Sequence, residues 1–92
     1  MVDGLQNRKM AYIRKVIMFE PMNPDLWVHL HLFSRDVAQK EKAIFKAYEL
    51  KPDNTFVQEV IIKHFLKTQQ WQKAFKVLIK SYQQQTTLNE PQ

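Results

Sequence analysis

Hydrophobic residues recur at steps of three and four along most of the chain, which is the spacing of one face of an α-helix. The pattern is clearest in QQWQKAFKVLIKSYQQQ, where one face carries Trp71, Ala74, Phe75, Leu78 and Tyr82. A second face of the same segment carries Lys73, Lys76 and Lys80. This segment is therefore predicted to be an amphipathic helix with a basic, solvated side. The stretches TFVQEVIIKHFLK and MAYIRKVIMFE show the same periodicity.

Prolines and short polar residues divide the periodic segments. Pro52 lacks a backbone donor and disfavours the helical conformation at the residue before it, so the helix in AIFKAYELK should end there. Asn54, or Thr55, is placed to cap the next helix. Pro24 suits a helix start, and Asp36 with Gln39 has capping-box spacing. Five helices are predicted, near 5–20, 24–34, 36–50, 54–68 and 70–84.

The predicted links 34–36 and 68–70 are short, which favours antiparallel helical hairpins. The chain has 92 residues, of which 45% are hydrophobic, with one glycine and four prolines. This composition supports a single core and lacks the turn residues of an all-β fold. We therefore predict one all-α domain over 1–92. Residues 10–85 should form its helical-repeat core, with flexible ends at 1–4 and 86–92.

The segment PDNTFVQEVIIKHFLKTQQWQKAFKVLIKSY resembles a tetratricopeptide repeat. Ile61, Phe65, Trp71 and Ala74 match that family's packing positions, and AIFKAYELKPDN resembles the usual end of a repeat. The earlier stretches NPDLWVHLHLF and KAIFKAYEL are more similar to the related half-a-tetratricopeptide repeat, and neither repeat has the family's close-packing glycine. The resemblance implies a right-handed α-solenoid with structural roles for Trp71 and Leu78. Truncating Trp71 to alanine would then cost about 3–5 kcal/mol.

The resemblance also implies a non-catalytic module that binds a peptide or helix of another protein, as an adaptor, chaperone-like or assembly subunit. In this family the first helix of each hairpin lines a concave groove. The positions that would face it are Phe56, Glu59, Val60, Lys63 and Lys67 in the second hairpin, and Asp25, Val28, His29 and Leu32 in the first. The alternative is that Phe56 and Val60 only pack against the preceding helices. Glu59 and Val60 replace the residues that carboxylate-gripping members of the family require, so that specialised activity is not expected.

Helical repeats bury their faces by stacking, and about three are normally needed for independent stability. Two hairpins and a leading helix fall short of that number. The chain is therefore expected to be an excerpt of a longer array, to self-associate, or to be completed by a partner.

The basic charge supports a second class of function. The net charge is +5, with Arg8, Lys9, Arg14 and Lys15 near the first helix and Lys73, Lys76 and Lys80 on the last. Such a patch would contact RNA or another nucleic acid through phosphates, and binding would weaken with salt. The alternative is that these cations only solvate the surface, as lysines on an outer helix face commonly do.

Neither catalysis nor a metal or other cofactor is expected. The chain has no cysteine and one glycine, which excludes thiol chemistry and a glycine-rich phosphate loop. His29 and His31 diverge by about 200° on a helix and cannot share a metal ion, and His64 is expected to be structural. No apolar run approaches the roughly 20 residues of a membrane helix, and no secretion signal is evident. An intracellular protein is therefore expected, cytoplasmic or nuclear.

Overall fold

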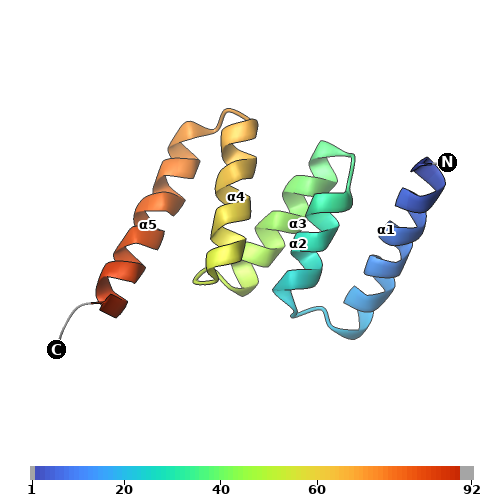
Figure 1. Ribbon diagram of the computed structural model, residues 1–92, viewed down its shortest axis with the longest axis horizontal. Helices are drawn as coiled ribbons and strands as arrows, with labels where there is room; N and C mark the ends of the chain where they lie inside the picture. The colour runs from blue at the N-terminus through green and yellow to red at the C-terminus, as the bar shows by residue number, and fades with distance from the viewer. Residues whose placement is uncertain (1, 90–92) are drawn as a thin grey trace.

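The chain forms a row of helices joined by short links (Figure 1). The structure is a computed structural model that describes the backbone of residues 2–89 and the side chains of residues 8–84. Its five helices are α1 (Val2–Phe19), α2 (Pro24–Phe33), α3 (Val37–Leu50), α4 (Thr55–Lys67) and α5 (Trp71–Asn89). The described residues contain no strand, so the all-α prediction is confirmed.

The helix starts predicted at Pro24 and near Asp36 are present, and Asn23 provides a cap that was not predicted. The side chain of Asn23 accepts a hydrogen bond from the amide of Asp25 at 3.1 Å, and Pro24 is the first residue of α2. Asp36 caps α3 by accepting from the amide of Gln39 at 3.3 Å. These oxygens satisfy backbone donors that the first helical turn leaves unpaired. The helix starts are therefore set by local chemistry.

The boundary between the two hairpins is also as predicted. α3 ends at Leu50, shortly before Pro52. Asn54 then caps α4, with its side chain accepting from the amide of Val57 at 3.1 Å. The helices at the chain ends are longer than predicted, because α1 begins at Val2 and α5 continues to Asn89. Flexibility was predicted for 1–4 and 86–92, and of these, residues 1 and 90–92 lie outside the described residues.

The helices pack against their neighbours in the row. α1 packs on α2, α2 pairs with α3, and α4 contacts both α2 and α3 before pairing with α5. α1 and α5 therefore lie at opposite ends of the row (Figure 1), whose extents are 53 × 31 × 18 Å. Within the described residues, no helix has the length and apolar character that spanning a membrane requires.

The main core lies between α2, α3, α4 and α5. Its members are small or branched apolar side chains and one phenylalanine: Val28, Ile44, Ala47, Val57, Val60, Ile61, Phe65, Ala74 and Val77. At the other end, α1 buries Met10, Ile13 and Ile17. Because α5 contributes only Ala74 and Val77, its backbone approaches α4 through its smaller apolar residues.

The two hairpin turns use the same hydroxyl contact. The Ser34 hydroxyl donates to the Leu30 carbonyl at 2.7 Å at the end of α2. The Thr68 hydroxyl donates to the His64 carbonyl at 2.9 Å at the end of α4. Ser34 and Thr68 are 34 residues apart (68 − 34), and the same displacement takes Val37, the first residue of α3, to Trp71, the first residue of α5 (71 − 37). We call this displacement the hairpin shift, and it relates the second hairpin to the first from the end of its leading helix onward.

Candidate functional site

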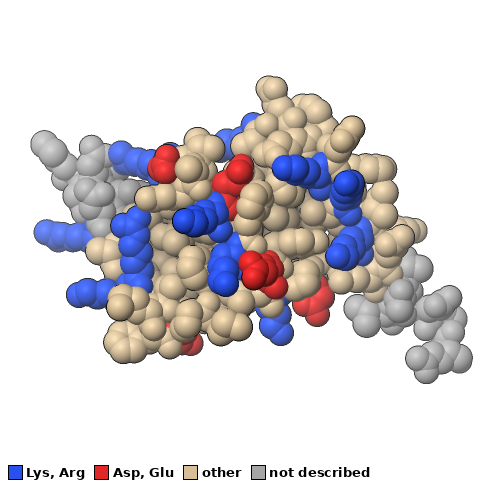
Figure 2. All heavy atoms as spheres, turned by 180° about the vertical axis from the view of Figure 1, so that it is seen from behind, with Lys and Arg blue, Asp and Glu red and all other residues tan. Residues whose placement is uncertain are grey.

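A groove with lysines along one side lies between α3 and α5, and α4 forms its floor. We call it the lysine groove. It has a volume of 330 Å³ and is lined by Phe45, Tyr48, Ile61, Phe65, Lys73, Lys76, Val77 and Lys80. Seen from behind, basic side chains lie over the α5 end of the molecule, and others lie over its middle and its α1 end (Figure 2). The groove thus combines an apolar floor with a cationic rim.

The rim follows from the helical spacing of α5. Ala74 and Val77 point into the core, so the lysines at steps of three and four fall on the adjoining face. Lys73, Lys76 and Lys80 are all exposed. No carboxylate among the described residues forms an ion pair with them. Three positive charges therefore stand along the groove without a counter-ion from the described part of the chain.

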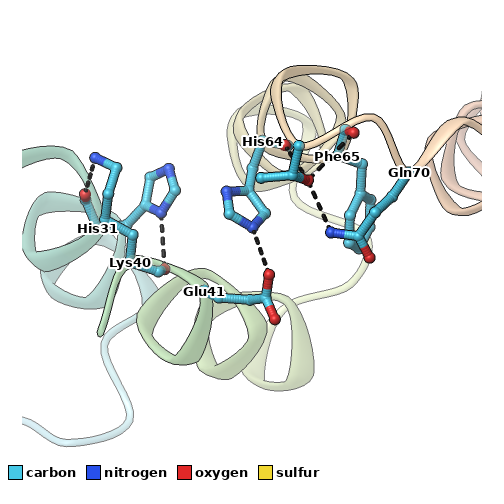
Figure 3. A network of polar contacts seen from close by, with 7 residues as sticks. His31, Lys40, Glu41, His64, Phe65 and Gln70 are labelled. Carbon is cyan, nitrogen blue, oxygen red and sulfur yellow. Dashed lines mark hydrogen bonds and ion pairs between the residues drawn. The ribbon is translucent and has the colours of Figure 1, made fainter. Parts of the chain in front are cut away.

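The floor is aromatic where α3 meets α4. Phe45 is 38% exposed and its ring centroid lies 5.8 Å from that of the buried Phe65. His64 packs edge-on to Phe45 at 6.3 Å. The His64 ring is in turn held by Glu41, with Nε2 donating to Oε2 at 3.2 Å (Figure 3). The orientation of Phe45 in the groove is therefore supported by a polar contact behind it.

A polar network joins α2, α3 and α4 beside this floor (Figure 3). The buried His31 donates from Nδ1 to the Lys40 carbonyl at 2.8 Å. The Lys40 ammonium donates to the carbonyls of His31 at 2.8 Å and Ser34 at 3.2 Å. The His31 and His64 rings meet edge to face at 5.3 Å. The network thus satisfies carbonyl groups at the end of α2 and ties three helices together.

Burial shifts the titration of this network. It lowers the pKa of His31 below its ordinary value of 6.5, and the positive charge of Lys40 acts in the same direction against the hydrogen bond to the Lys40 carbonyl. Burial also lowers the pKa of the Lys40 ammonium, with a further contribution from Lys67. His31 is therefore held neutral near pH 7. Among the described residues, no three His, Asp or Glu side chains are grouped so as to hold a metal ion.

The residues predicted for a single partner groove lie on different surfaces. Val60 is buried in the core, so it offers no surface to a partner. Glu59 and Lys63 are exposed and form an ion pair at 3.6 Å beside α5. His29 instead faces α1, in a hollow of 520 Å³ lined by Arg8, Lys9, Tyr12, Ile13, Leu26, His29 and Phe33. Phe56, Leu32 and Lys67 are exposed but line neither this hollow nor the lysine groove.

The predicted basic patch is also divided. Arg14 and Lys15 belong to α1, whereas the three groove lysines belong to α5 at the other end of the row. Arg14 donates to the Gln39 side chain at 3.1 Å, and Lys15 is exposed. The sequence left two interpretations of the α5 lysines open, a patch that contacts nucleic acid and a solvated face. The position of Phe45 and Tyr48 opposite these lysines was not predicted, because that juxtaposition depends on how α3 and α5 flank α4.

A second hollow lies between α4 and α5, and we call it the α4–α5 face. It has a volume of 440 Å³ and is lined by Thr55, Gln58, Glu59, Ile62, Lys63, Leu66, Leu78 and Ser81. Beside it, α5 exposes the large side chains of Trp71, Phe75 and Tyr82. Trp71 is 61% exposed and Leu78 is 53% exposed, so their predicted core roles are wrong. The small residues of α5 face α4, which leaves the aromatic residues outside.

Comparisons with protein-family models, with curated proteins and with solved structures find no match to this chain. The function must therefore be argued from the surfaces themselves.

Proposed function

We propose that this chain is a non-catalytic protein-binding module, an adaptor or assembly subunit of the tetratricopeptide or half-a-tetratricopeptide type, whose hairpins stack as part of a right-handed α-solenoid. The repetition of the helix pair, with the same hydroxyl contact at both turns, supports this assignment. The partner segment is a peptide or helix that carries both acidic and apolar side chains, and it binds in the lysine groove. This site involves the second helices of the hairpins, in contrast to the first-helix groove that the family resemblance implies.

The observation that carries the proposal is the unpaired lysine rim above an apolar floor. Along the axis of α5, Lys73 and Lys76 are about 4.5 Å apart, and Lys76 and Lys80 are about 6 Å apart. Alternate side chains of an extended peptide are about 7 Å apart, which long lysine side chains can match. An exposed ion pair contributes about 0.2–1 kcal/mol, so three give directionality and only modest affinity. Apolar side chains of the partner would add affinity by covering Phe45 and Tyr48.

RNA is the second candidate, and the same groove favours it. Phosphates would pair with the lysines, and the exposed part of Phe45 offers a ring on which a base could stack. The two candidates differ in salt dependence, because phosphate contacts release counter-ions and binding then falls steeply with added salt. A peptide held partly by apolar contacts should lose less affinity than RNA when salt is added.

The test compares two fluorescent probes by anisotropy: a short peptide in which Asp alternates with Leu and Phe, and a single-stranded oligouridine. We expect the peptide to bind with a Kd of roughly 10–100 μM, and Lys76→Glu to weaken it about tenfold. Lys42→Glu, an exposed lysine on α3 outside the groove, is the matched control for charge reversal. Equal weakening by both variants would show that net charge, and not the groove, attracts the peptide. Tighter, salt-sensitive binding of the oligouridine would favour RNA.

A further inference from the structure

The α4–α5 face corresponds to a face of the first hairpin that is already covered. The hairpin shift that matches Ser34 to Thr68 also matches Ile44 to Leu78. By the same shift, Val28 on α2 corresponds to Ile62 on α4. The equivalent positions are apolar in both hairpins, so both hairpins present the same kind of surface.

The exposure of these equivalent positions differs sharply. Ile44 is 0% exposed because it packs in one cluster with Val57 and Ile61 of α4. Leu78 is 53% exposed, because no helix of the described chain covers it. Val28 is likewise fully buried, whereas Ile62 is only partly buried. In the first hairpin, an amphipathic helix, α4, covers this surface and contacts both α2 and α3.

We propose that the α4–α5 face binds one amphipathic α-helix of a partner protein, seated as α4 is seated on α2 and α3. The interface would continue the packing already present inside the molecule. Ile62, Leu66 and Leu78 line the hollow, and the rings of Trp71 and Phe75 stand beside it. The site is distinct from the lysine groove and does not depend on the function proposed for that groove.

The chemistry of the incoming helix follows from α4. On α4, the residues that pack into the core fall at steps of three and four: Val57, Val60, Ile61 and Phe65. The partner helix therefore presents branched aliphatic residues and an aromatic residue at that spacing, facing a hollow of 440 Å³. At the rim of the hollow, Glu59 and Lys63 already form an ion pair with each other, so the partner helix needs no net charge to match them.

A second copy of this chain is a poorer occupant. The apolar face of α1, with Met10, Ile13 and Ile17, is already buried on α2 and is not free to dock elsewhere. Two α4–α5 faces meeting each other would place hollow against hollow, whereas packed helices fit ridges into grooves. Each copy also carries a net charge of +5, which opposes association.

The test uses the helix whose seating is known. A fluorescein-labelled peptide with the sequence of residues 54–68 is titrated with the full chain, and anisotropy reports binding. We expect saturable binding, weakened at least tenfold by Leu78→Asp and by Leu66→Asp. Val37→Asp is the matched control, because Val37 is an exposed aliphatic residue at the start of α3 and does not line the α4–α5 face. Circular dichroism confirms that each variant keeps its helix content.

Further arms separate the alternatives. Lys80→Glu should leave binding of the helical peptide unchanged, since Lys80 lines the lysine groove and not this face. Absence of binding up to about 1 mM peptide, or equal binding to wild type and Leu78→Asp, would overturn the proposal. A concentration-dependent dimer of the full chain in sedimentation, lost in Leu78→Asp, would also overturn it and assign the face to a second copy.

Discussion

Ile44 and Leu78 occupy equivalent places in the two hairpins, and truncating each to alanine should have very different effects on stability. Ile44→Ala removes three carbons from a side chain that is 0% exposed. At about 0.8 kcal/mol per buried carbon, the lost transfer free energy is about 2.4 kcal/mol. The cavity that remains raises the loss in unfolding free energy to about 3–4 kcal/mol.

Leu78→Ala removes the same number of carbons from a side chain that is 53% exposed. Only about half of the transfer free energy is lost and no enclosed cavity forms, so the expected loss is about 1 kcal/mol. Urea denaturation followed by circular dichroism measures both variants, provided the m-value stays constant. If Ile44→Ala leaves too little folded protein to measure, Ile44→Val should still cost about 1 kcal/mol. Equal losses for Ile44→Ala and Leu78→Ala would refute the reasoning, because Leu78 would then be covered in solution.

Two further predictions concern Trp71 and His31. Trp71→Ala should cost about 1–2 kcal/mol in a urea titration, because the side chain is 61% exposed, and the loss of about 3–5 kcal/mol typical of a buried tryptophan would contradict the exposed position. The tryptophan emission of this variant comes only from the half-buried Trp27, so its maximum should lie at a shorter wavelength than that of the wild type. The lowered pKa of His31 means that the unfolded chain binds the proton first as the pH falls through about 6.5, so the melting temperature should decrease below that pH. His31→Asn keeps a donor near Nδ1 but does not titrate, so its melting temperature should fall less between pH 7.5 and 5.5, and identical slopes would exclude His31 as the cause.

The helix starts and stops were predictable because they depend on nearby residues. Asn54 lies close in sequence to the Val57 amide that it caps, and Pro52 acts on its own backbone and on the residue before it. Such interactions are present in the sequence before any tertiary contact forms. The short links likewise limit where successive helices can lie, so the pairing of α2 with α3 and of α4 with α5 could also be expected.

The orientation of α5 was not predictable in the same way. Its sequence contains two apolar stripes, and the larger one, with Trp71 and Phe75, suggests the stronger hydrophobic drive. The structure buries the smaller stripe, with Ala74 and Val77, because small side chains allow α5 to approach α4 closely. Hydrophobicity along one helix does not report which neighbouring surface is present to cover it.

The candidate sites depended on contacts between distant residues, and most were missed. The lysines were identified, but the aromatic floor opposite them comes from α3 and α4. The pairing of His31 with Lys40 and of His64 with Glu41 also crosses between helices. A polar residue at a core-facing helical position, as His31 is, was the one available signal of that network.

The pattern of helix contacts has a consequence for how the molecule opens. Among the described residues, α2, α3 and α4 all contact one another, whereas the backbone of α1 packs only on α2 and that of α5 only on α4. Amide hydrogen exchange should therefore be slowest in the central three helices and faster in the two end helices, each of which packs its backbone against one neighbour. A helix bound across α4 and α5 would give α5 a second neighbour and slow its exchange. Slower amide exchange in α5 would thus report that the α4–α5 face is occupied.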